Sequence, residues 1–358
     1  MLEVSVLRAA GALLAMAFLL HGFFQLRRRR TAPGVTVLTL LTGIGLVGAT
    51  AFPQTVGALS WVLFDDSGAR GLAGRPGARL FVLVIAGLVA AWLVALMLMA
   101  RTARLRSELD RLIRHQVVRE SPEAERELGP DTVVVAIPAF DEADNLPGVL
   151  ARMPERVDGH RVRAVVIDDG SRDATCAVAR EHGALVTALP FNRGQGAALR
   201  VGYDFAVRAA AAALVTLDAD GQNQPEELPE LVAPVLAGAA DIVIGSRRLG
   251  RHEVTVWWRD LGVTLFTRVM NLLMGTCLTD VSSGYRAMAP AALAQLHLTQ
   301  DQYHASEFLI MAAKLGHRIT ERPIYFRRRS SGASKKGNDL LYGLRFAWVL
   351  VTSWLRPV

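Results

Sequence analysis

Short apolar runs alternate with helical segments from residue 132 onward, and this alternation restricts the fold more than any other feature of the chain. The runs are TVVVAIPAF, RAVVIDDGS, GALVTALPF, ALVTLDADG and DIVIGSR. Helical segments such as DATCAVAREHG and GAALRVGYDFAVRAAAA separate them. Strands that are apolar on both faces and joined by helices form a mostly parallel sheet covered by helices. The sequence therefore predicts an α/β domain whose ligands bind beyond the carboxyl ends of its strands.

Three uncharged apolar runs occupy much of the first hundred residues. They cover residues 9–26, 35–52 and 80–100, and a membrane-spanning helix needs about 17–25 apolar residues. Three buried helices of a soluble bundle are the alternative, although uncharged runs of this length are rare there. A cleaved signal peptide fits poorly, because the basic block follows the first run instead of preceding it. We expect residues 1–101 to form an all-α transmembrane module of three helices.

The distribution of arginine predicts the orientation of this module. The block at residues 27–30 and the cluster at residues 101–114 flank opposite ends of a two-helix excursion, and positively charged flanks stay in the cytoplasm. We therefore expect an integral protein of the cell inner membrane, with three N-terminal spans, the amino terminus outside and everything after residue 101 inside. Homo-oligomers could form through the transmembrane module.

Two further segments have the composition of surface-seated helices. Residues 102–131 begin as an amphipathic helix with leucines at helical spacing, which would lie on the membrane surface or against a neighbouring chain, and they end as a polar linker with two prolines. Residues 337–358 are apolar, contain Trp348 and Trp354, and follow a basic run, which is typical of an interfacial helix. A helix packed on the α/β domain is the open alternative for this second segment.

The excess of basic residues does not indicate nucleic-acid binding. The chain has a net charge of +7, but the basic residues gather beside the apolar runs and near the carboxyl end, where anionic lipid headgroups would attract them. No motif of a nucleic-acid-binding module is present. Cys176 and Cys277 form neither a CxxC motif nor a metal-ligand spacing, so we expect them to be reduced packing residues.

Two aspartates lie one residue apart where a predicted strand ends in TLDADGQNQ. Asp218 and Asp220 carry like charges that repel each other, and a cation between them would remove that cost. Oxygen ligands of this kind, with Gln222 close behind, suit Mg²⁺ or Mn²⁺, which takes its remaining ligands from water and substrate phosphate. A strand end in solvent is the alternative if the triplet is considered alone.

Three other motifs occur at strand ends. IPAFDEADNL brings Glu142 to the rim, and VVIDDGSRDAT brings Asp168 and Asp169, whose carboxylates can accept hydrogen bonds from a nucleobase or from ribose hydroxyls. NRGQGAALRVG places two glycines before a helix, where backbone N–H groups can approach a phosphate, and Arg193 adds positive charge. Each of these motifs alone also fits an ordinary turn with a capping residue.

The ordered set IPAFDE, VVIDDGSRDAT, NRGQGAA, DADGQ, IGSR, DVSSGYR and FRRRSSGASK resembles family 2 glycosyltransferases of the GT-A fold. It is most similar to the dolichol-phosphate mannose synthase and polyprenyl-phosphate glycosyltransferase branch, over residues 132–336. Residues 1–117 also resemble a small three-span module that precedes some bacterial members. The QxxRW motif of processive polysaccharide synthases is absent from the sequence.

The resemblance implies a membrane-anchored, inverting, metal-dependent hexosyltransferase that uses Mg²⁺ or Mn²⁺. Its donor would be a GDP- or UDP-sugar, and its acceptor a polyprenyl phosphate (undecaprenyl, decaprenyl or dolichyl) at the cytoplasmic face. Transfer to a lipid-linked saccharide or another lipid is one alternative. A non-catalytic membrane scaffold that keeps the GT-A shell is another, although a scaffold needs neither the paired aspartates nor the late arginines.

The resemblance also implies roles for matching residues. The residues that would bind the nucleotide are Pro138, Phe140, Glu142, Asp168, Asp169 and Arg193. Those that would bind the metal are Asp218, Asp220 and Gln222. Those that would hold or border donor and acceptor phosphates are Arg247, Arg259, Asp280, Arg286, Arg329, Ser334 and Lys335. The ones expected to be catalytic are Asp218, Asp220, Arg247 and Arg329. Ala333 stands where the family often has an acid, and the sequence leaves open which of Arg327, Arg328 and Arg329 contacts phosphate.

Overall fold

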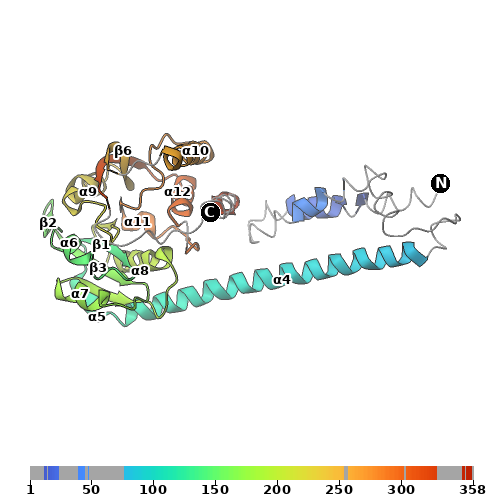
Figure 1. Ribbon diagram of the computed structural model, residues 1–358, viewed down its shortest axis with the longest axis horizontal. Coiled ribbons are helices and arrows are strands. Elements are labelled where there is room, and N and C mark those ends of the chain that lie inside the picture. The colour runs from blue at the N-terminus through green and yellow to red at the C-terminus, as the bar shows by residue number, and fades with distance from the viewer. Residues whose placement is uncertain are drawn as a thin grey trace. The chain divides into compact units, whose positions relative to one another are not determined.

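The chain forms two compact units in the computed structural model (Figure 1), which describes residues 12–13, 15–23, 39–44, 47, 76–253, 257–301, 304–328, 349–350 and 352–356. The first unit comprises Met1–Ser107 with Leu355–Pro357, and the second comprises Glu108–Trp354 with Val358. Helix α4 (Pro76–Arg119) begins in the first unit and ends in the second.

The described part of the first unit is helical. Helical residues occur within 12–23 and 39–47, and α4 contains the whole of the predicted third span. Parts of the first two predicted spans lie outside the described residues, as do the side chains at the start of α4. Of the helices that the described residues form, none is both long and apolar enough to cross a membrane. The three-span module is therefore not shown by the structure and stays a prediction.

An eight-stranded sheet forms the centre of the second unit, with the order β2-β3-β1-β5-β7-β6-β8 and with β4 paired to β3. The strands are β1 (Thr132–Ala139), β2 (Arg156–Val157), β3 (His160–Asp168), β4 (Leu185–Ala188), β5 (Ala213–Thr216), β6 (Ile242–His252), β7 (Arg286–Met288) and β8 (Ile319–Phe326). Strands β1, β3, β4 and β5 are parallel, and β6 is parallel to β8, whereas β7 runs antiparallel to β5 and β6. The predicted α/β fold with a mostly parallel sheet is confirmed.

Helices cover both faces of this sheet (Figure 1). They are α5 (Pro122–Glu127), α6 (Leu146–Leu150), α7 (Thr175–Glu181), α8 (Gln195–Arg208), α9 (Leu228–Leu236), α10 (Trp257–Met274), α11 (Pro290–Leu293) and α12 (His304–Lys314), with a 3₁₀ turn, η2, at Pro225–Glu227.

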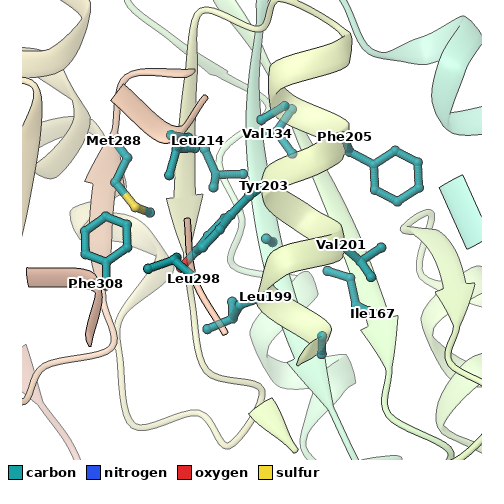
Figure 2. Packing of buried hydrophobic residues seen from close by; sticks show 14 of the residues in the cluster. Val134, Ile167, Leu199, Val201, Tyr203, Phe205, Leu214, Met288, Leu298 and Phe308 are labelled. Atoms are coloured by element: carbon teal, nitrogen blue, oxygen red, sulfur yellow. The ribbon is translucent and has the colours of Figure 1, made fainter. Parts of the chain in front are cut away.

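Alternate residues of each strand enter two separate cores, because successive side chains point to opposite faces of a sheet. Val134 of β1 packs in the core beneath α8 and α12, whereas its neighbour Val133 packs in the core beneath α7 and α9. Figure 2 shows Tyr203 of α8 among Leu214 of β5 and Phe308 of α12. Strands buried on both faces explain why the apolar runs in the sequence are continuous instead of alternating.

The strand register brings the predicted motifs to one edge of the sheet. Asp168 ends β3 opposite Ala139 of β1, and Thr216 ends β5 opposite Arg286, which also pairs with Ile244 of β6. The residues that follow β1, β3 and β5, the part of β6 beyond Ile244, and the residues that precede β7 therefore all emerge at this edge.

The end of α4 packs against the second unit through a face other than its leucine stripe. Val117 and Val118 are buried in the core, with Ile113 packed against it, whereas Leu109 and Leu112 are exposed. The predicted amphipathic segment is thus the continuation of one long helix. In the carboxyl-terminal segment, Leu350 belongs to the core, while Trp354 remains partly exposed.

Candidate active site

The DADGQ loop leaves β5 with its two carboxylates held by neighbouring groups. Asp218 is half-buried and accepts a hydrogen bond of 2.7 Å from Nε2 of Gln195, while the buried Asp220 accepts one of 3.1 Å from the N–H of Gln222. A Cβ added to Gly284 would lie 3.3 Å from an oxygen of Asp218. A glycine at this position therefore keeps the space beside the Asp218 carboxylate open.

Gln222 connects this loop to the end of β8. Its carbonyl accepts a 2.8 Å hydrogen bond from the N–H of Arg327, and its side-chain nitrogen donates to the Arg327 carbonyl at 3.2 Å. The next turn is fixed by Tyr285, whose hydroxyl donates to the carbonyl of Gln224 at 3.0 Å. The side-chain bond uses the amide nitrogen of Gln222, whereas a metal would take the amide oxygen.

Arg247, three residues beyond the last paired residue of β6 on the β7 side, is fixed by a two-pronged ion pair. Its Nε and Nη2 donate to the two carboxylate oxygens of Asp280 at 2.6 and 2.7 Å, and Nη2 also donates to the Ser282 hydroxyl at 2.6 Å. Its guanidinium carbon lies 5.1 Å from the ring centre of Phe326. Burial alone would raise the pKa of Asp280, but the hydrogen bonds and charge of Arg247 hold it below the usual value.

Glu321 of β8 holds the segment that carries Asp280 in place. Its carboxylate accepts hydrogen bonds from the N–H of Thr279 at 2.8 Å, the Thr279 hydroxyl at 3.0 Å and the N–H of Asp280 at 2.9 Å. The loop that carries Asp280 is thus anchored to the sheet, and the direction of the Arg247 guanidinium follows from that anchor.

The two adjacent acids at the end of β3 hold loops. Asp169 accepts hydrogen bonds of 2.7 Å from the N–H groups of Arg193 and Gly194, and Asp168 accepts one of 3.1 Å from the N–H of Ser171. Burial raises the pKa of Asp169, and the two N–H bonds oppose that shift. Gly170 has a φ of +77°, and an added Cβ would lie 2.8 Å from the backbone nitrogen of Asn192. This approach admits only glycine.

The residues after β1 are held by the same turn. The N–H of Glu142 donates to the Thr175 hydroxyl at 3.0 Å, and its carboxylate accepts from Nδ2 of Asn145 at 2.6 Å. Pro138 and Phe140 are partly exposed at this rim. The ends of β1, β3 and β5 therefore form one continuous polar edge.

Comparison with known proteins identifies the family. The model of glycosyl transferase family 2 matches residues 134–295. A polyprenol monophosphomannose synthase of Mycolicibacterium smegmatis is 34% identical over 236 residues, which are 62% of this chain and 86% of that protein. An undecaprenyl-phosphate mannosyltransferase of Micrococcus luteus is 32% identical over 239 residues, which are 62% of this chain and 93% of that protein. The chain belongs to glycosyl transferase family 2. It is a glycosyltransferase.

Among solved structures, a glucosyl-3-phosphoglycerate synthase from Mycobacterium tuberculosis in complex with Mn²⁺, UDP and phosphoglyceric acid is also similar to this glycosyltransferase. It is 21% identical, with a TM-score of 0.49 over 66% of this chain and 81% of that one.

The structure of the glycosyltransferase brings most of the described site residues to the same edge of the sheet. The guanidinium groups of Arg286 and Arg193, however, contact other protein groups. Arg286 is buried, and its guanidinium donates to the carbonyls of Ser283, Ala305 and Val281 at 2.8 to 3.1 Å. Burial lowers its pKa to about 10. The guanidinium of Arg193 contacts Asp110 at 2.8 Å. Arg329, Ser334, Lys335 and the side chain of Arg259 lie outside the described residues.

The paired aspartates of the glycosyltransferase fit a divalent cation that is completed by substrate. In the described ranges, no group of three or more His, Cys, Asp or Glu side chains could hold a metal ion by itself. Asp218 and Asp220 supply hard oxygen ligands, and Gly284 leaves space beside the first of them. Mg²⁺ in enzymes is often bound by one or two carboxylates together with substrate phosphates, which is the set that this loop can offer.

Three residues of this site carried no signal in the sequence. Gln195 contacts Asp218 but lies inside a glycine motif read for its backbone, and Glu321 lies in a strand that the apolar pattern did not reveal. Asp110 lies between arginines on the segment that the sequence predicts to be an amphipathic helix, and nothing in that pattern connects it to the site. For Gln195, the only sequence signal was the glycine-rich motif that contains it.

Proposed function

We propose that this glycosyltransferase transfers a sugar from a GDP- or UDP-sugar to a polyprenyl phosphate, with inversion at the anomeric carbon. The observation that carries the proposal is the paired Asp218 and Asp220 at the same sheet edge as the fixed cation of Arg247. The names of the two bacterial relatives, a polyprenol monophosphomannose synthase and an undecaprenyl-phosphate mannosyltransferase, favour the same acceptor class.

An acceptor phosphate removes the need for a general base. A hydroxyl acceptor loses a proton during attack and requires a positioned carboxylate or histidine. A phosphate monoester has a second pKa of about 6, so it is largely a dianion near neutral pH and attacks without proton transfer. What the chain must provide is positive charge that holds this dianion in line with the anomeric carbon.

The residues of the site divide this work. Arg247 presents a planar guanidinium, the group best suited to a phosphate, and Asp280 fixes its plane. Asp218 and Asp220 would hold the cation, and Asp169 fixes the glycine-rich loop by accepting the N–H groups of Arg193 and Gly194. A divalent ion bound there would stabilise the charge that develops on the departing nucleotide diphosphate.

We further propose that the protein is anchored in the inner membrane with its catalytic unit at the cytoplasmic face. Leu109 and Leu112 of α4 are exposed, and α10 exposes Leu265, Val269 and Leu272 along one side. Apolar side chains that are exposed in a row favour contact with lipid, because insertion into the membrane removes their apolar surface from water. A lipid-linked acceptor would be presented at that same boundary.

The topology predicts that a reporter fused after Val358 is cytoplasmic. Nucleotide-sugars are made inside the cell, so the catalytic unit must face that side to reach its donor. Reporter activity in intact cells measures this directly, with a second fusion before Met1 as the control of opposite sign. A carboxyl-terminal reporter that is active only outside would contradict both the topology and the proposed donor.

The function predicts that purified full-length protein releases UDP or GDP from a nucleotide-sugar only when polyprenyl phosphate and a divalent cation are present. A panel of UDP- and GDP-sugars, each offered with and without polyprenyl phosphate, measures donor and acceptor together. Transfer to a lipid-linked saccharide but not to polyprenyl phosphate would support the alternative acceptor. The absence of release with any combination would support a non-catalytic scaffold.

A further inference from the structure

A cluster of charged side chains joins the end of α4 to the glycine-rich loop of the site. Its members are Asp110, Arg114, Arg193, Arg200, Asp204 and Asp301. Asp110 lies at its centre, because its carboxylate accepts hydrogen bonds from Nη2 of Arg200 at 3.0 Å and from Nε of Arg114 at 2.9 Å. It also forms an ion pair of 2.8 Å with Nη2 of Arg193. All of these residues belong to the second unit.

The carboxylate of Asp110 uses its two oxygens for different purposes. Oδ1 forms the ion pair with Arg193 and accepts a hydrogen bond from Arg200, whereas Oδ2 accepts one from Arg114, which also donates to Asp204 at 2.6 Å. The first oxygen therefore contacts the glycine-rich loop and Arg200 of α8, and the second contacts Arg114 of α4 itself. A change at Arg114 disturbs the cluster without removing the contact to Arg193.

Arg193 is held at both ends. Its backbone N–H donates to Asp169 at 2.7 Å, and its guanidinium lies against Asp110, with Asp301 at 3.6 Å. Its side chain is only 12% exposed. A residue fixed at its backbone by the sheet and at its side chain by α4 has little freedom to move, and the loop conformation is fixed with it.

The rest of the loop is wedged between the same elements. The N–H of Gly196 donates to the carbonyl of Asp301 at 2.9 Å, and an added Cβ on Gly196 would come within 2.4 Å of the Gln300 carbonyl. Between these fixed points lies Gln195, whose Nε2 reaches Asp218 at 2.7 Å. A continuous series of contacts thus runs from Asp110 through Arg193 and the loop to Gln195 and Asp218.

Burial and the neighbouring arginines have opposite effects on the pKa of Asp110. Burial would raise the pKa of Asp110, but Arg200, Arg114 and Arg193 hold it below its usual value, so the carboxylate stays ionised. An ionised carboxylate that three arginines contact sets the position of each of them. Removal of its charge would leave Arg193 and Arg200 to compete for Asp301 alone.

We propose that Asp110 is a positioning residue of the donor site, which orients the glycine-rich loop and Gln195 toward Asp218 by holding the guanidinium of Arg193. The proposal rests on the proposed function, because it assumes that the nucleotide diphosphate binds beside this loop. In this role the end of α4 is a structural component of the donor site, and Arg193 acts through its contacts with the protein instead of binding phosphate through its guanidinium.

The test is the affinity of the full-length protein for UDP and GDP in the presence of Mn²⁺, measured by titration calorimetry in detergent. Asp110→Asn keeps the size of the side chain and removes its charge. We expect it to raise the dissociation constant of the bound nucleotide about tenfold, which corresponds to about 1.4 kcal/mol. The KM for the nucleotide-sugar should rise similarly, with a smaller change in kcat, because the loop binds ground state and transition state alike.

Arg114→Gln is the matched control. It breaks the same cluster on the side of Oδ2 and leaves the contacts of Oδ1 in place. We expect Arg114→Gln to lose about as much thermal stability as Asp110→Asn. Its nucleotide affinity should change less than about twofold, because its contact is independent of the one to Arg193. Asp110→Asn combined with Arg193→Gln should weaken binding no more than the stronger single change, because both act through one contact.

Three results would overturn the proposal. Unchanged or tighter nucleotide binding by Asp110→Asn would show that the contact between Asp110 and Arg193 is not needed to orient the loop for nucleotide binding. Equal losses of affinity in Asp110→Asn and Arg114→Gln would show a general effect on the fold. If the unchanged protein binds neither nucleotide, the donor class itself is wrong, and the proposed function fails together with this inference.

Discussion

Asp220→Asn should lower the rate of sugar transfer by about 10³-fold or more and leave the fold intact. Metal ions stabilise developing charge by several kcal/mol, and each 1.4 kcal/mol is about tenfold in rate. The asparagine keeps an oxygen where Oδ1 of Asp220 accepts the N–H of Gln222, so the turn is retained while the charge is lost. Turnover in a purified protein, with thermal unfolding measured in parallel, checks both parts of the expectation.

Asp241→Asn is the matched control for this change. Asp241 precedes β6 at the opposite edge of the sheet, where it pairs with the exposed Arg318 at 2.8 Å. The same substitution there should cost a little stability and leave the transfer rate unchanged. Full activity of Asp220→Asn, or of the unchanged enzyme in excess chelator, would remove the metal from the mechanism.

The sheet was predictable because its strands are buried on both faces. The apolar runs that contain β1, β3, β4, β5 and β6 are short and bounded by turn residues, and a parallel sheet is the arrangement that buries them. Strand β8 was missed, because Thr320, Glu321 and Arg322 interrupt its apolar character at the edge of the sheet. Strand β7 has only three residues, too few for any pattern.

The positions of the acids were predictable from the same logic, whereas their hydrogen bonds were not. Asp168, Asp169, Asp218 and Asp220 follow strands, so parallel pairing brings them to one edge. That Asp169 holds the backbone of Arg193 depends on how the loop folds back, which no local pattern encodes. Asp110 and Arg193 lie far apart in the sequence, and only tertiary packing joins them.

The membrane prediction rests on a different kind of signal. Hydropathy and arginine placement identify spans without reference to tertiary contacts, and they therefore remain expectations where the side chains of the runs are outside the described residues. The exposed Leu109 and Leu112 are informative because they lie on the same helix as the buried Asp110. Asp110 faces the protein together with Val117 and Val118, whereas Leu109 and Leu112 face outward, so this helix end exposes apolar side chains as well as burying them.

Arg247→Met should destabilise the catalytic unit by about 3 kcal/mol and abolish transfer. Asp280 is only 1% exposed on its side chain, and removal of one partner of a buried ion pair leaves a charge without compensation, at a cost of about 3–5 kcal/mol. The lower figure applies because the Arg247 side chain is 26% exposed and Ser282 still donates to Asp280. Thermal unfolding of the full-length protein at pH 7 measures the loss.

The control for this prediction is Arg318→Met, which removes the arginine of an exposed pair. Asp241 is also held below its usual pKa by hydrogen bonds from its arginine, but the Arg318 side chain is 58% exposed. Exposed pairs contribute about 0–1 kcal/mol, so this variant should unfold within a few degrees of the unchanged protein. The double variant Arg247→Met with Asp280→Asn should regain part of the stability that Arg247→Met loses, because the isolated buried charge is gone.

The contribution of Asp280 to the pH dependence of stability should have opposite signs in the unchanged protein and in Arg247→Met. In the unchanged protein its pKa is held below the usual value, so its contribution is present above the pKa of the unfolded chain and is lost as the pH falls through the folded value. In Arg247→Met the main charge that lowers this pKa is absent, and burial then raises it above that of the unfolded chain. The folded state of the variant would therefore bind the proton more tightly than the unfolded state, and acidification from pH 7 toward pH 5 should reduce the difference in unfolding temperature between the two proteins. A difference that stays constant or grows over this interval would mean that Asp280 is not left as a buried charge, and that Arg247 serves the site in some way other than through this pair.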